Sequence, residues 1–157
     1  MKTSFLSLLI FFAIIVPGCK KENPKPSSTS AGTTSSFILL RNGNLFVAKK
    51  TIVTSDWTDY IQIEARSLPN QTYNAFNMLL RKDLQPGEYS HTQLPGGTFS
   101  LGYTTQGQSF VINHGTINIL SNDTAAKKME FQFEAELVDI MSTDNLQISN
   151  GKSTIYY

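Results

Sequence analysis

Apolar and polar residues alternate along much of the chain after residue 36, with the period of two that is typical of β-strands. The longest alternating segment is 127–139, where every second position is apolar: Met129, Phe131, Phe133, Ala135 and Leu137. Polar residues, mostly Glu and Gln, stand between them. An α-helix would scatter these apolar residues around its circumference, whereas a strand places them on one face. The pattern therefore predicts a long, half-buried strand.

Shorter segments alternate in the same way, for example 60–66, with Ile61, Ile63 and Ala65 on one face. Segment 74–81 also has the residue propensities of a short helix, but its position between two strands favours a strand. The whole pattern predicts about nine to eleven strands and no convincing helix. The predicted strands and short strand pieces are 37–41, 44–48, 51–54, 60–66, 74–81, 84–89, 99–104, 115–121, 127–139, 146–149 and 152–157.

Two Asn-Gly dipeptides separate predicted strands. Asn-Gly favours a type I′ turn, because both central residues of that turn need a positive φ. We therefore expect one hairpin around Asn42-Gly43 and a final hairpin around Asn150-Gly151. The polar segment 122–126 is expected to be the loop of a third, longer hairpin.

Strands of this number and spacing, joined by short turns, form an antiparallel β-sandwich or a closed β-barrel. The alternation does not separate these two folds, so both stay open. Residues 36–157 suffice for a single β domain and are too few for two ordinary domains. The predicted fold class is all-β.

The N-terminal segment has a different pattern. Lys2 precedes the stretch from Phe5 to Val16, which is almost entirely apolar. Such a stretch is too short to span a bilayer as a stable helix and suits a signal peptide. It ends in Val16-Pro17-Gly18-Cys19, which resembles the lipobox of bacterial lipoproteins. We therefore expect residues 1–18 to be a signal peptide that is removed, and Cys19 to carry lipid.

Residues 19–35 are rich in Lys, Pro, Ser and Thr and contain few apolar residues. Burial cannot offset the entropy of ordering such a segment, so we expect a flexible stalk. Lys20 stands where an Asp signals inner-membrane retention in some Gram-negative bacteria. The outer membrane is therefore the expected location, and its periplasmic face and the cell surface both stay open.

Charge and cysteine content limit the kinds of partner and of covalent cross-link that the chain can have. Without Lys2, 12 Lys and Arg residues stand against 12 Asp and Glu residues. This balance lacks the basic footprint of a nucleic-acid-binding protein. Cys19 is the only cysteine, so an intrachain disulfide is excluded. We expect the membrane as one partner, through the lipid anchor, and a glycan or an envelope protein as another.

Three motifs in the second half of the chain add a family resemblance. They are a Gly-Thr-hydrophobic strand at 115–119, a Phe-x-Phe strand at 131–135 and an Ile-x-Asn-Gly ending at 148–151. Together with the lipobox and the stalk, they make the chain resemble small Gram-negative lipoproteins of the Bacteroidota type, from an all-β domain family of unknown function. The resemblance implies an exported all-β lipoprotein and carries over no catalytic residue.

The only tryptophan, Trp57, lies in a polar loop between Asp56 and Asp59 and is followed by Tyr60. An aromatic ring beside carboxylates is the combination that a sugar-binding platform needs, because the ring stacks on C–H groups while the acids accept hydrogen bonds from hydroxyls. The alternative is an ordinary loop anchor whose ring packs on the core. These four residues are the candidate ligand-binding site.

Asp123-Thr124-Ala125 matches a short acceptor motif for O-glycosylation of exported proteins in some Gram-negative bacteria, which makes Thr124 a candidate modification site. No Gly-x-Ser-x-Gly nucleophile motif occurs in the sequence. His91 and His114 are the only histidines, too few for a zinc site without cysteines. We expect no catalytic residue, no metal and no cofactor.

The expected function is that of a non-enzymatic envelope lipoprotein, acting as a binding or interaction module. Two alternatives stay open. One is a calycin-like carrier that holds a small apolar ligand inside a hollow barrel, with Phe76, Phe99, Phe131 and Phe133 on the cavity wall. The other is an inhibitor of a periplasmic enzyme, in which a rigid loop plugs the active site of that enzyme.

Overall fold

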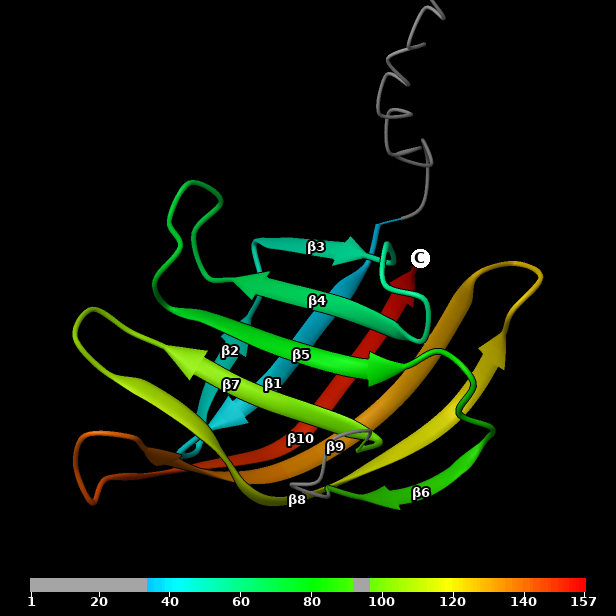
Figure 1. Cartoon of the computed structure of the whole chain (residues 1–157). Helices are drawn as coiled ribbons and strands as arrows, with labels where there is room; N and C mark the ends of the chain where they lie inside the picture. Colours follow the sequence, from blue (N-terminus) through cyan, green and yellow to red (C-terminus); the bar gives the residue numbers. More distant parts are fainter. Residues whose placement is uncertain (1–33, 92–96) are drawn as a thin grey trace, which may run out of the picture. The chain divides into compact units, whose positions relative to one another are not determined.

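The computed structural model describes residues 34–91 and 97–157, in which all paired strands run antiparallel (Figure 1). No helix occurs among these residues, and therefore none that could cross a membrane. The predicted all-β class is confirmed. The ten strands are β1 (Ser36–Arg41), β2 (Asn44–Val47), β3 (Lys50–Thr54), β4 (Tyr60–Arg66), β5 (Ala75–Arg81), β6 (Gly87–Ser90), β7 (Phe99–Thr104), β8 (Ser109–Asp123), β9 (Lys128–Asp139) and β10 (Asn145–Tyr156).

The strands form one curled sheet in the order β2-β1-β10-β9-β8-β7-β5-β4-β3, with β6 paired to β8. The two end strands, β2 and β3, are consecutive in the chain and are joined only by Ala48 and Lys49. The Ala48 backbone N–H donates to the Phe37 carbonyl at 3.0 Å, and that of Lys49 donates to the Arg66 carbonyl at 2.8 Å. The link therefore hydrogen-bonds to both ends of the sheet and holds them together.

The concave side of the curl contains the core. The apolar face predicted for 127–139 is buried along β9, and the alternating residues of β4, β5 and β7 are buried in the same way. The ring of Phe76 lies 4.9 Å from that of Phe46, 6.0 Å from that of Phe37 and 4.4 Å from that of Tyr103, between ring centroids. Phe37 also contacts Phe133 at 5.3 Å. This ring cluster connects β1 and β2 to β5, β7 and β9 across the curl.

One polar contact also crosses the interior. Arg41 at the end of β1 donates a hydrogen bond to the Tyr103 hydroxyl, and its guanidinium carbon lies 5.0 Å from the centroid of that ring. The hydroxyl in turn donates to Asn74 Oδ1 at 3.2 Å. Burial raises the pKa of Tyr103. The Tyr103 hydroxyl therefore stays protonated and can both accept from Arg41 and donate to Asn74.

The strand predicted at 115–121 is longer in the structure, because β8 already begins at Ser109. Its pairing with β9 shifts register between Ile112 and His114, so the alternation changes phase there. His114 consequently lies within β8 rather than at its start. Gly115 follows the shift, and a Cβ there would lie 2.6 Å from the Glu134 carbonyl oxygen, which explains the glycine.

The two Asn-Gly dipeptides have different structures. Asn42 and Gly43 both have positive φ, 47° and 76°, and form the predicted hairpin turn between β1 and β2. At the second dipeptide only Asn150 has a positive φ, 51°. The predicted final hairpin is therefore wrong: β10 continues through it as one strand, with a register shift between Ile148 and Gly151.

The reason lies in the partners of β10. It pairs with β9 on one side and with β1 on the other, on both sides of the shift, so a reversal at Asn150 would break two ladders. Gly151 is needed for a second reason. A Cβ at this position would lie 2.7 Å from ring carbons of Phe133, well inside contact distance. The dipeptide thus forms a bulge that leaves room for a core ring.

The predictions for the N-terminal segment concern residues that precede the described part of the chain. The signal peptide 1–18, the lipidated Cys19 and residues 19–33 of the stalk lie outside the described residues.

Replacing Gly151 by Ala should destabilise the fold by about 1–3 kcal/mol, because the new methyl group overpacks the core against Phe133. Urea denaturation of the purified chain measures this free energy of unfolding. In a Phe133→Leu background, which removes the ring, Gly151→Ala should cost clearly less. An equal cost in both backgrounds would contradict the steric explanation.

Candidate functional site

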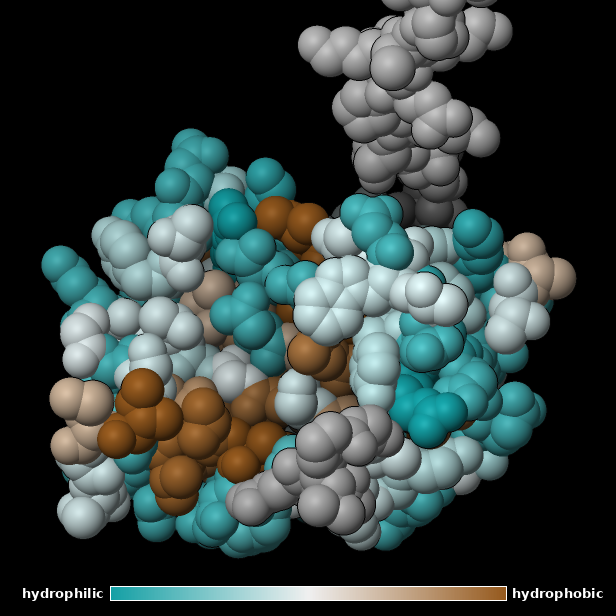
Figure 2. Space-filling view, viewed as in Figure 1, coloured by the Kyte–Doolittle hydropathy of each residue, from teal (hydrophilic) through white to brown (hydrophobic). Residues whose placement is uncertain are grey.

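An open groove of about 390 Å³ lies on the outer face of β4, β5, β7 and β8. Figure 2 shows apolar residues gathered on this side of the molecule, over β7 and β8, among hydrophilic neighbours. Below, "the groove" means the hollow formed by the outward-facing residues of these strands and by one residue of the loop before β4: Trp57, Gln62, Asn77, Leu79, Ser100, Gly102 and Val111.

The register of the strands explains the hollow. Leu79 pairs with Gln62 on one side and with Ser100 on the other, while Gly102 pairs with Asn77 and with Val111 in the next row. Large and small side chains therefore alternate across the sheet. Because Gly102 has no side chain and that of Ser100 is small, the backbone of β7 forms the floor of the groove.

Trp57 stands at the edge of the groove, in a loop that Lys82 holds in place. The Lys82 ammonium donates to the carbonyl oxygens of Ser55 at 2.7 Å and Trp57 at 2.5 Å, and lies 3.4 Å from that of Thr58. The Lys82 backbone N–H donates to the Asp59 carbonyl at 2.9 Å. A charged donor that binds several carbonyls of one turn fixes the turn more firmly than neutral contacts do. The loop 55–59 is therefore preorganised.

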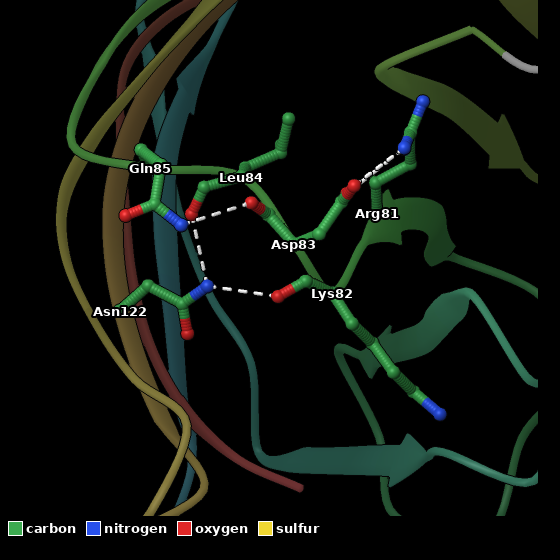
Figure 3. A network of polar contacts seen from close by, with 6 residues as sticks. All are labelled: Arg81, Lys82, Asp83, Leu84, Gln85 and Asn122. Carbon is green, nitrogen blue, oxygen red and sulfur yellow. Dashed lines mark hydrogen bonds and ion pairs between the residues drawn. The ribbon is translucent and has the colours of Figure 1, made fainter.

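Lys82 is itself positioned by Asn122 of β8. Figure 3 shows the Asn122 amide directed at the backbone that follows β5. Its Nδ2 donates to the carbonyls of Lys82 at 2.8 Å and Leu84 at 2.9 Å, and its Oδ1 accepts from the Tyr157 hydroxyl at 3.0 Å. The side chain thus ties the β5–β6 connection, the end of β8 and Tyr157 together.

Two arginines flank the groove, and each forms a bidentate ion pair with a carboxylate of its own strand or of the turn that follows it. Arg66 donates to Glu64 at 2.6 and 2.9 Å, and Arg81 donates to Asp83 at 2.9 and 2.5 Å. The hydrogen bonds from Arg81 lower the pKa of Asp83, so this pair stays ionised. Among the residues that the structure describes, no charged side chain lines the groove itself.

The structure separates the four predicted binding residues. Trp57 lines the groove, and its side chain is 54 % exposed rather than packed in the core. Asp56 and Asp59 are exposed and do not line it. Tyr60 is half-buried and lies opposite Arg81 in the β4–β5 ladder. The partners of Trp57 in the groove are uncharged side chains in place of the expected carboxylates.

Sequence reasoning did not find these partners: Gln62, Asn77 and Ser100. They come from three strands, and only the register of the sheet brings them onto one face. One signal was present in the sequence, because Ser100 and Gly102 are small residues at outward positions in the middle of a strand. Small residues there mark a place where the sheet surface is hollow or closely approached.

Thr124 lies in the exposed turn between β8 and β9. Asp123 Oδ1 accepts from the Ala126 backbone N–H at 2.8 Å, which shapes the turn around the threonine. The neighbouring Asn122 uses its amide for the contacts described above. Thr124 is therefore sterically open to modification, as a candidate acceptor must be.

The histidines have structural partners. His91 Nδ1 lies 2.9 Å from the Phe99 carbonyl oxygen, and the exposed His114 lies 3.5 Å from Glu136. Within 34–91 and 97–157, no group of three or more His, Cys, Asp or Glu residues could hold a metal ion.

A carboxylate organises the turn between β9 and β10. Asp139 accepts from the Ser142 hydroxyl at 2.8 Å and from the Met141 backbone N–H at 3.3 Å. The hydrogen bond from Ser142 is the main cause that lowers the pKa of Asp139. The turn displays Ile140 and Met141, the latter 85 % exposed. It lies near the groove, since Val111 pairs with Val138.

Comparison of the chain with protein-family models, with curated proteins and with solved structures gives no match. The resemblance to Bacteroidota-type lipoproteins therefore stays a prediction, and function has to be argued from the residues.

Replacing Lys82 by Met should release the loop 55–59 and lower the free energy of unfolding by about 1–2 kcal/mol, because several carbonyls lose their donor. Trp57 is the only tryptophan, so the anisotropy of tryptophan fluorescence reports on this loop and should fall. Lys152→Met, at an exposed position of β10, is the matched control. Unchanged anisotropy in Lys82→Met would contradict the proposed role of Lys82.

Replacing Asp139 by Asn should destabilise the protein in a pH-dependent way. The folded-state pKa is below the unfolded value of about 3.9, so the carboxylate stabilises the fold above that pH and loses this effect as pH falls through the folded pKa. The stability gap between the original protein and the variant should therefore be full near about pH 7 and shrink below about pH 4. Urea denaturation at both pH values measures it. Ser142→Ala should reproduce part of the gap, and a gap independent of pH would contradict the prediction.

Proposed function

We propose that this chain is a lipid-anchored envelope lipoprotein whose β domain is a non-enzymatic binding module. The observation that carries the proposal is the groove, an open hollow with a preorganised aromatic residue at its edge. Binding sites on rigid β scaffolds are commonly built in this way, from loops and outward side chains. The two histidines contact a backbone carbonyl and a surface glutamate.

The anchor and the location rest on the sequence. Cys19 follows a stretch with signal-peptide character, and Lys20 favours the outer membrane over retention in the inner membrane. A domain held on a stalk of about 17 residues could contact partners roughly 20 Å or more from the lipid surface, if the stalk behaves as a flexible coil. A glycan or another envelope protein is the expected partner.

The carrier alternative receives less support. It needs a cavity walled by the four phenylalanines named for it, yet Phe76 contacts three other rings, and Phe131 and Phe133 lie 6.0 Å apart in the buried cluster. Phe99 packs against His91 at 5.7 Å. At these positions the interior is filled with side chains, which leaves the groove as the better candidate for a ligand.

The inhibitor alternative has one observation in its favour. Asp139 fixes the β9–β10 turn, which presents an exposed methionine on a rigid base. A plug needs this combination of fixed backbone and projecting side chain. Inhibition of periplasmic hydrolases by the full-length chain, abolished by Met141→Asp, would support this function over the groove.

In cells, Cys19→Ser should move the protein from the membrane fraction to the soluble fraction, because the lipid attachment site is gone. Fractionation followed by immunoblotting measures this. Protease treatment of intact cells then distinguishes the two membrane faces, since only a surface domain is degraded. A Cys19→Ser protein that stays in the membrane fraction would contradict lipid anchoring.

The binding role of the groove is tested with two substitutions that fill it, Gly102→Leu and Ser100→Leu. Gly102→Leu puts a Cβ 3.3 Å from the Phe110 carbonyl oxygen and strains the fold slightly; Ser100→Leu serves as the second variant. Both should lose ligand binding while retaining cooperative unfolding. Full binding by both folded variants would place the site elsewhere.

A further inference from the structure

We infer that the groove binds a neutral saccharide, with Trp57 as the stacking platform and the amides of Gln62 and Asn77 as the groups that recognise hydroxyls. The inference rests on the proposed binding function and names its ligand class. It depends on three features of the groove: polar groups without protein partners, an aromatic ring on a preorganised loop, and the lack of charged side chains among the described lining residues.

The polar groups are the first feature. Gln62, Asn77 and Ser100 point outward into the groove from three neighbouring strands. Within the part of the chain that the structure describes, none of their side chains hydrogen-bonds to another protein group, whereas the nearby cations Arg66, Arg81 and Lys82 all do. An amide offers a donor and an acceptor side by side, which is the pattern that a sugar hydroxyl, itself both donor and acceptor, can satisfy twice.

The aromatic ring is the second feature. A saccharide ring has an apolar face of C–H groups, and an indole offers a large flat surface with one polar N–H at its edge. Trp57 is half exposed, and its loop is held by Lys82 before any ligand arrives. Less conformational entropy is therefore lost on binding. Leu79 and Val111 add apolar surface to the lining of the groove.

The absence of charge is the third feature, and it selects among saccharides. Arg66 and Arg81 flank the groove but are neutralised by bidentate carboxylates, Glu64 and Asp83. Among the described residues that line the groove, a sulfated or acidic sugar would find no free cation, and a basic ligand would find no free anion. A lipid chain fits the neutrality, but it would cover the amides of Gln62 and Asn77 without satisfying them, which is costly.

The test uses the full-length chain, solubilised in a detergent without a sugar headgroup, and the fluorescence of its single tryptophan. The probes are neutral gluco-, manno- and galacto-oligosaccharides of two to six units, sialylated and uronic-acid oligosaccharides, and a fatty acid. We expect a saturable change in Trp57 emission with at least one neutral oligosaccharide and weaker binding of its acidic counterpart. Isothermal titration calorimetry then provides the affinity independently of the reporter.

Substitutions of the groove residues test which side chains contact the oligosaccharide. Trp57→Ala should weaken binding of that oligosaccharide by about tenfold or more, as expected for a central aromatic anchor, and Trp57→Phe should restore part of the loss. Gln62→Ala and Asn77→Ala should each weaken it by about two- to tenfold. Gln132→Ala, an exposed amide on β9 outside the groove, is the matched control and should have no effect.

The outcomes separate the two proposals. If only the fatty acid or an acidic sugar binds, and Gly102→Leu abolishes that binding, the saccharide inference is overturned while the binding function stands. If no probe binds and the Trp57 emission never changes, the saccharide inference is overturned. The binding function of the groove is overturned as well if the folded Gly102→Leu and Ser100→Leu variants retain full binding in the test above. Oligosaccharide binding that is unaffected by Trp57→Ala and Gln62→Ala would overturn the assignment to this groove.

Discussion

The fold depends on contact between the two ends of one curled sheet, and the ring cluster around Phe76 is the main source of that contact. Phe76 of β5 touches a ring of the neighbouring β7 and rings of β1 and β2, which lie at the other end of the sheet order. A flat sheet would expose all these rings to water on one side. Curling buries them together, and burial of aromatic side chains is among the largest stabilising terms for a domain of this size. The short link 48–49 then fixes the edges that the core has brought together.

The residue composition of the outer face of the sheet follows from this arrangement. Because every second residue of β4, β5 and β7 is committed to the core, the residues between them are free to serve other purposes. Beside the groove some of them are charged and paired, as in Glu64–Arg66. In the groove they are uncharged or small, which is the property that distinguishes it from its surroundings.

Most of the fold followed from the alternation of residues, because a period of two directly encodes which face is buried. The faces of β4, β5, β7 and β9 were predictable for this reason. Errors arose where a bulge interrupts the period, at Asn113-His114 and at Asn150-Gly151. A local sequence cannot show that Asn150 has ladder partners on both sides, since those partners are residues near 37–41 and 131–135.

The groove was predictable only in part. Trp57 was conspicuous as a single aromatic residue in a polar loop, whereas Gln62, Asn77 and Ser100 become neighbours only through strand register. The role of Lys82 was hidden for a similar reason, because its ammonium group binds carbonyls about 25 residues away in the sequence. Charge patterns identify partners among side chains, but backbone acceptors carry no signature in the sequence.

The pairing of β1 with β10 has a consequence for the order of folding. Their ladder joins residues such as Ser36 and Thr154, which are 118 positions apart. The β1–β2 hairpin can form early, but its other edge has no partner until β10 has been synthesised. Contacts of such long sequence separation slow folding, because the loop entropy is lost before the contact stabilises anything. A nascent chain would therefore stay incompletely folded until β10 has been synthesised and can pair with β1.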